Sequence, residues 1–133
     1  MKTYSLLFSL LFCVYGFSQT NFKTLKESSA TAVKANKQIL LIHVNSEESR
    51  LEIDKKISSI QDAFVIHYVN VSKNSTLTEE QLMLNTRLDR SYNAGKSYPS
   101  LVVLGKYGTK KGVSFSPNSG LTIDQFISSL KAH

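Results

Sequence analysis

Three short and almost purely apolar segments constrain the fold of this chain most. Residues 39–44, 63–71 and 100–104 each have the length of a strand and are rich in β-branched, aliphatic or aromatic side chains. Continuous apolar runs of this length are typical of strands that are buried on both faces of a sheet. Other elements of the chain must therefore cover both sides of a central sheet.

Helical patterns alternate with these strands. Apolar side chains recur at helical spacing in residues 22–36, 51–60, 84–92 and 123–130. Thr78 with Gln81, and Thr122 with Gln125, have the spacing of capping boxes that begin helices. Residues 111–116 alternate apolar and polar, which is typical of an antiparallel edge strand. The order α-β-α-β-α-β-β-α predicts an α/β protein with a mixed sheet, a C-terminal antiparallel hairpin and a closing helix.

Residues 1–18 have the pattern of a secretory signal peptide. Lys2 gives a positive start, residues 6–15 form a short apolar core, and Gly16 and Ser18 are small residues before a cut at Gln19. The core is too short to cross a bilayer, so we expect no permanent membrane anchor. The sequence thus predicts an exported protein, periplasmic or secreted, with a single domain over residues 19–133.

The single cysteine, Cys13, lies in the segment predicted to be removed. The mature chain would then contain no thiol and no disulfide. No Gly-rich phosphate loop and no Gly-x-Ser-x-Gly motif is present, and no Asp or Glu has a spacing that marks it as the partner of a histidine. These features predict no catalytic residue, no cofactor and no metal.

The chain has a formal net charge of +6, and its cations are spread along the sequence. No arginine-rich or aromatic-interleaved stretch occurs, so we expect no binding to nucleic acid. The charge is interpreted as a solvated surface that favours anionic partners.

Three stretches carry a resemblance to a known family. Ala30–Leu41 is similar to a helix, Asn-Lys turn and first central strand, and Asn85–Tyr92 followed by Tyr98-Pro99 and an apolar strand is similar to a helix that leads to a cis-proline and a hairpin. The last helix closes the pattern at residues 123–130. In this order they resemble the thioredoxin-like superfamily, in particular small secreted domains of bacterial envelopes. The resemblance implies a three-layer α/β/α sandwich over residues 22–130.

The chain departs from this family at the redox site. Redox-active members carry Trp-Cys-x-x-Cys after the first central strand, whereas this chain has Asn-Ser-Glu-Glu-Ser-Arg-Leu at residues 45–51. Leu41 or Ile42 occupies the place where many members keep a buried carboxylate. Both differences exclude thiol–disulfide chemistry. Glu47 and Glu48 stand where the reactive thiolate would be, and we interpret them as ordinary acidic residues of a helix start.

Redox-inactive relatives serve as recognition or chaperone domains, so the resemblance implies a non-catalytic module that binds a protein or peptide. We expect a monomer that holds an extended segment of an envelope or secreted protein. The candidate binding surface consists of Asn45, Ser46, Glu47, Glu48, Ser49, Arg50, Tyr98 and Pro99.

Two alternatives remain open from the sequence. His43 and His67 lie on neighbouring predicted strands, and with Glu47 and Glu48 they would form a metal site or a non-thiol active site, because imidazole and carboxylate suit zinc. A histidine within an apolar strand is more often packed and hydrogen-bonded. The second alternative is a structural accessory subunit of an envelope assembly that uses another face.

Overall fold

The computed structural model describes residues 22–73 and 76–131. Its elements follow the predicted order: α2 (Leu25–Ala35), β1 (Gln38–Val44), α3 (Glu47–Lys56), β2 (Phe64–Asn70), α4 (Glu79–Tyr92), β3 (Ser100–Leu104), β4 (Lys110–Phe115) and α5 (Ile123–Lys131). The predicted signal peptide, residues 1–18, lies outside the described residues. In the described ranges, none of the helices is both long enough and apolar enough to span a bilayer.

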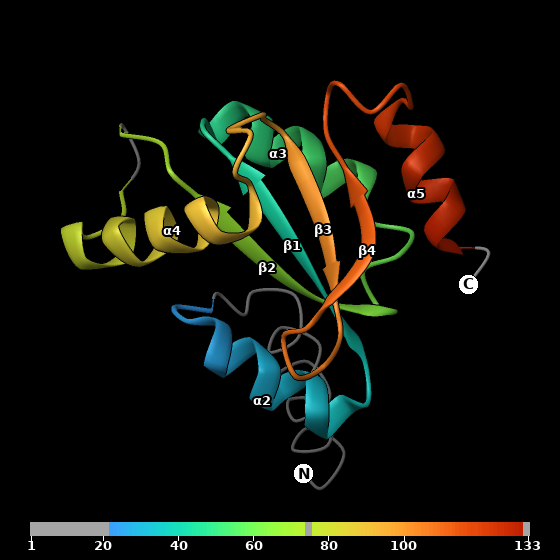
Figure 1. Ribbon diagram of the computed structural model, residues 1–133, viewed down its shortest axis with the longest axis horizontal. Coiled ribbons are helices and arrows are strands. Elements are labelled where there is room, and N and C mark those ends of the chain that lie inside the picture. Colours follow the sequence, from blue (N-terminus) through green and yellow to red (C-terminus); the bar gives the residue numbers. More distant parts are fainter. Residues whose placement is uncertain (1–21, 74–75, 132–133) are drawn as a thin grey trace, which may run out of the picture.

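The sheet has the strand order β2-β1-β3-β4 (Figure 1). β1 and β2 run parallel and are joined by α3, which makes a crossover between them. After α4 the chain returns on the other side of β1, so β3 pairs with β1 in the antiparallel direction, and β4 pairs antiparallel with β3. The mixed sheet with a C-terminal hairpin is therefore confirmed, with its parallel part limited to β1 and β2.

Two apolar clusters cover the two faces of the sheet. Because successive side chains of a strand point to opposite faces, Leu40 and Ile42 of β1 pack with α3 and α5, whereas Ile39 and Leu41 pack with α2 and α4. All four side chains are fully buried. The apolar run of β1 is thus explained by burial on both faces, and the fold has the three layers expected from the sequence.

Polar side chains begin the helices, as the sequence indicated. At the start of α5, Thr122 and Gln125 bond reciprocally, each side chain accepting the backbone N–H of the other. At the start of α4, Thr78 Oγ1 accepts the backbone N–H of Gln81, but in the described ranges Gln81 accepts no bond from the N–H of Thr78, and its Nε2 donates to the carbonyl of Lys23. The second capping box is therefore only half formed, because Gln81 links α4 to the start of α2.

Candidate functional site

The predicted binding surface is assembled where β1 ends and β3 begins. His43 of β1 is paired with Ser100 of β3, so the residues that follow β1 and precede β3 meet at the same end of the sheet. α3 begins at this end with Glu47. The structure thus brings the loop of residues 45–50 to the end of the sheet where β3 begins, and Tyr98 and Pro99 directly precede β3.

The loop and the first turn of α3 are fixed by contacts to β2. Glu47 Oε1 accepts a hydrogen bond from Asn70 Nδ2 at 2.8 Å. The Arg50 guanidinium lies 5.1 Å from the ring centroid of Tyr68 and 3.8 Å from Glu47 Oε2. Glu48 is exposed. Glu47 and Glu48 occupy the first turn of α3, where the helix dipole favours negative charge.

Ser46 caps α3, and this cap gives a first prediction. Its Oγ accepts the backbone N–H of Ser49 at 3.1 Å, and its backbone is extended, as an N-cap requires. We expect Ser46→Ala to lower the free energy of unfolding by about 1 kcal/mol, because the N–H of Ser49 loses its acceptor. Urea denaturation measures this change. Ser46→Asp restores the acceptor and should recover the loss, and a failure to do so would contradict the capping role.

Tyr98 is anchored by its side chain, and its backbone takes no part in the pairing of β1 with β3. The Tyr98–Pro99 peptide bond is cis, and the phenol donates a hydrogen bond to Asp89 Oδ2. Burial and this acceptor both raise the pKa of Tyr98 above the usual value for tyrosine. No backbone hydrogen bond of Tyr98 occurs within residues 22–73 and 76–131.

Asp89 of α4 is the centre of a buried polar cluster beneath this surface. Its Oδ1 accepts from His43 Nδ1 at 2.9 Å and from Asn93 Nδ2 at 3.1 Å, while its Oδ2 accepts from Tyr98. The sequence indicated no carboxylate partner for a histidine, and this interpretation was wrong. His43 and Asp89 are 46 positions apart, a separation that no local motif encodes.

Burial and the Asp89 carboxylate together determine the protonation state and the tautomer of His43. Burial lowers the pKa of His43 from its usual value, and the neighbouring Asp89 only partly opposes this shift. A carboxylate accepts but does not donate, so the neutral imidazole must carry its proton on Nδ1. Nε2 of His43 is buried without a hydrogen-bond partner in the described part of the chain. Asp89 therefore acts as a structural acceptor that orients His43 and Tyr98.

His67 lies on the same face of the sheet and is equally enclosed. Its Nδ1 is hydrogen-bonded to the hydroxyl of Ser28, and Phe22 stacks on the ring with a centroid distance of 5.9 Å. Burial lowers the pKa of His67 to about 4; the charge of His43 adds to this shift, and Glu27 opposes it. Both histidines are 0% exposed, so neither is open to a dissolved substrate.

The four residues of the suggested metal or non-thiol active site do not converge. His43 and His67 bond to residues of α4 and α2, on one side of the sheet. Glu47 bonds to Asn70, which belongs with Phe64 and Ile66 to the α3 side. The described residues contain no group of three or more potential metal ligands. Residue parity along β2 places the Asn70 side chain, and with it Glu47, on the face of the sheet opposite to the two imidazoles.

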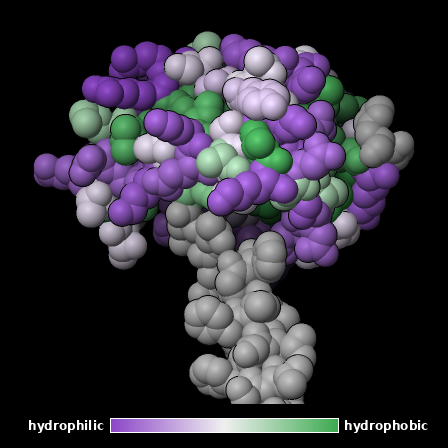
Figure 2. Space-filling view, turned by 90° about the horizontal axis from the view of Figure 1, so that it is seen from below, coloured by the Kyte–Doolittle hydropathy of each residue, from purple (hydrophilic) through white to green (hydrophobic). Residues whose placement is uncertain are grey.

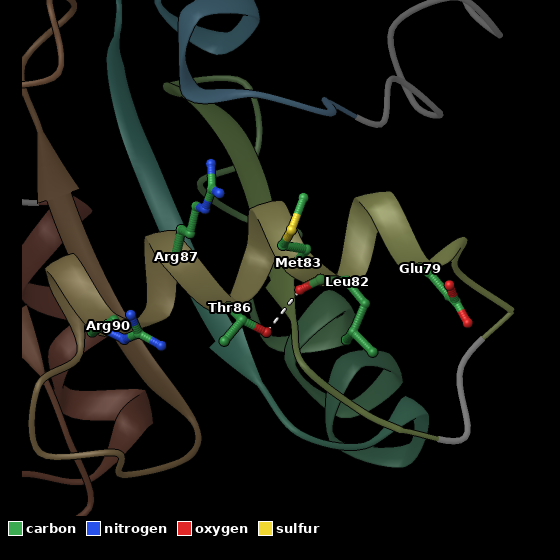
Figure 3. A pocket seen from close by; sticks show the side chains of 6 residues that line it. All are labelled: Glu79, Leu82, Met83, Thr86, Arg87 and Arg90. Atoms are coloured by element: carbon green, nitrogen blue, oxygen red, sulfur yellow. Dashed lines mark hydrogen bonds between the residues drawn. The ribbon is translucent and has the colours of Figure 1, made fainter.

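A shallow depression of about 340 Å³ lies elsewhere, along the outer side of α4 (Figure 3). All of its lining residues belong to this one helix: Glu79, Leu82, Met83, Thr86, Arg87 and Arg90. The hydroxyl of Thr86 is used internally, since it donates to the carbonyl of Leu82 at 2.7 Å. The depression does not include the end of the sheet where Tyr98 and the loop meet.

Comparison with known proteins identifies the architecture. No protein-family model matches the sequence, and no curated protein matches it. A solved structure described as a DsbH oxidoreductase aligns with a TM-score of 0.63 and 16% sequence identity over 82% of this chain and 80% of that chain. The fold is thioredoxin-like. At this identity the likeness shows the thioredoxin-like fold alone, and the chain, with one cysteine, contains no Cys-x-x-Cys pair.

Proposed function

We propose that this chain is an exported, monomeric and non-catalytic binding module. It holds an extended segment of another envelope or secreted protein along the surface formed by residues 45–50, Tyr98 and Pro99. The observation that carries the proposal is that the Tyr98 backbone has no backbone hydrogen-bond partner within residues 22–73 and 76–131, at the end of the sheet where α3 also begins. An added strand would pair with this backbone.

Charged side chains on the first turn of α3 support recognition of a peptide. Backbone hydrogen bonds give an added strand its affinity, and side-chain contacts give its specificity. Glu48 is exposed, so its charge is accessible to a partner, whereas the half-buried Arg50 guanidinium lies against Tyr68 and Glu47. Asp89 holds the Tyr98 ring from beneath, which fixes the neighbouring backbone before a partner arrives.

The composition of the site supports a non-catalytic role. The chain lacks the dithiol pair on which thiol–disulfide exchange depends. His43 and His67 are both fully buried in the core, and their Nε2 atoms are buried as well. The neutral imidazole of His43 is used to hold a structural hydrogen bond.

A library of immobilised extended peptides tests this proposal. We expect retained peptides to bind at least about tenfold more weakly to Glu48→Lys and Arg50→Gln, because loss of a charged contact removes more than about 1.4 kcal/mol. Glu52→Lys is the matched control, since Glu52 is exposed on the same helix one turn further from Tyr98. N-methylation of the peptide residue that faces Tyr98 should also abolish binding.

Two results would overturn the proposal. One is equal binding of the retained peptides to the Glu48 and Glu52 variants. The other is a partner whose binding is changed neither by Glu48→Lys and Arg50→Gln nor by N-methylation. That result would assign the protein an accessory role that uses another face.

A further inference from the structure

The positive charge of the protein is concentrated at one end of the molecule. Residues 22–38 carry four lysines and one glutamate, and residues 105–111 carry three lysines and no acidic residue. These two segments hold a formal charge of +6, whereas the remaining described residues carry eight Lys or Arg and nine Asp or Glu. The cations are spread along the sequence, but the fold joins two lysine-rich segments that are distant in it.

Direct contacts join the two segments. Lys106 Nζ donates to Asn36 Oδ1 at 3.1 Å across 70 positions of sequence, and Ser29 Oγ donates to the carbonyl of Lys106 at 2.6 Å. Figure 1 shows the β3–β4 turn against α2, at the other end of β3 from Tyr98. We call this region the basic end. Its lysines are Lys23, Lys26, Lys34 and Lys37 in the α2 segment, with Lys106, Lys110 and Lys111 in the turn and the start of β4.

Apolar groups protrude among these lysines. Tyr107 is 72% exposed in the turn, with Lys106 Nζ 5.7 Å from its ring centroid, and Val33 is 41% exposed on α2. Figure 2 looks at the molecule from below, where the described surface is mostly hydrophilic with isolated apolar patches. A tyrosine has an apolar ring and a polar tip, a combination that is enriched at the interface between lipid and water.

We propose that the basic end docks onto the anionic headgroups of a lipid bilayer, with Tyr107 entering the headgroup region. All cations of the basic end are lysines, which meet phosphate as point charges and do not need the paired geometry of arginine. They extend over a helix and a turn and do not line the depression on α4. Such an arrangement suits an extended anionic surface better than a compact anionic ligand.

This docking is independent of the proposed peptide surface. The basic end and Tyr98 lie at opposite ends of β3, so a protein docked in this way would keep residues 45–50 and Tyr98 accessible. Failure of lipid binding would leave the peptide experiment untouched, and the reverse also holds.

Flotation with vesicles of phosphatidylcholine containing about a third phosphatidylglycerol tests the proposal, using the full chain in every variant. Each lysine near an anionic bilayer contributes roughly a fivefold factor in partition, so Lys26→Gln, Lys34→Gln and Lys111→Gln together should weaken binding about a hundredfold. Lys55→Gln, Lys73→Gln and Lys131→Gln, a triple variant of exposed lysines outside the basic end, is the matched control and should leave binding within about twofold. Both triple variants keep the same N-terminal segment. The difference in their vesicle binding therefore reports the contribution of the basic end alone.

Salt and soluble competitors separate the possible ligands. We expect the difference in binding between the two triple variants to fall strongly between roughly 0.05 M and 0.5 M salt and to be absent on pure phosphatidylcholine. Tyr107→Ala should weaken binding to vesicles without changing any binding to soluble polyglutamate. Equal losses in the two triple variants, or a difference between them that persists on neutral vesicles, would overturn the proposal. Polyglutamate binding with no effect of Tyr107→Ala on vesicles would reassign the basic end to a soluble polyanion.

Discussion

Replacement of Asp89 by alanine should lower the free energy of unfolding by roughly 3–5 kcal/mol, because it removes a buried charged acceptor that is shared by several donors. The donors left behind are His43 Nδ1, the Tyr98 hydroxyl and Asn93 Nδ2. His43 is fully buried, so water cannot replace the lost acceptor of its N–H group. Denaturation by urea at neutral pH measures the change.

Matched variants separate the roles of Asp89. Asp124→Ala removes an exposed carboxylate that lies 3.2 Å from Lys56 Nζ, so it should cost at most about 1 kcal/mol. Tyr98→Phe removes a single donor and should cost about 1 kcal/mol. Suppose that Asp89→Ala lowered the free energy of unfolding no more than Asp124→Ala does. The buried acceptor would then contribute no more to stability than an exposed carboxylate, and another contact would have to hold Tyr98 in place.

The fold could be predicted because its signals are local. The apolar run of β1 specifies burial on both faces, and the stripe of α5 at Phe126, Ile127 and Leu130 specifies the face that packs on the sheet. The apolar pattern did not mark the C-terminal end of α3. α3 ends at Lys56, and the predicted helical residues Ile57 and Ile60 lie in the turns that follow, where they are still buried. Apolar spacing reports burial and does not mark where helical hydrogen bonding stops.

The buried part of the site could not be predicted because its contacts are distant in sequence. Asp89 meets His43 only after α4 has packed across the sheet, and Ser28 meets His67 across 39 positions. The lysines of the basic end likewise come together only through contacts between segments that are distant in sequence, as between Lys106 and Asn36. Residues 45–50 and Tyr98 lie at the same end of the sheet because β3 runs antiparallel to β1, a strand direction that the alternation of strands and helices does not specify.

Acid should destabilise the protein in the range where free histidine becomes protonated. The pKa of His67 falls from 6.5 to about 4 on folding, mainly through burial. Between these values the unfolded chain binds a proton at His67 that the folded chain does not, so stability is complete above pH 6.5 and is lost as the pH falls. A shift of this size corresponds to about 3 kcal/mol by pH 4. The lowered pKa of His43 acts in the same direction.

Urea denaturation at a series of pH values between 7 and 4, at constant ionic strength, measures this loss. Other groups titrate in the same range, so the contribution of His67 is the difference between variants. In His67→Phe with Ser28→Ala, the aromatic ring stays against Phe22 while the titrating group and its hydroxyl partner are removed. The change in unfolding free energy between pH 7 and pH 4 should then shrink by about 3 kcal/mol. Ser28→Ala alone keeps the imidazole and should retain the full pH dependence. An unchanged pH dependence in the double variant would show that His67 is not the group whose burial makes the folded protein sensitive to acid.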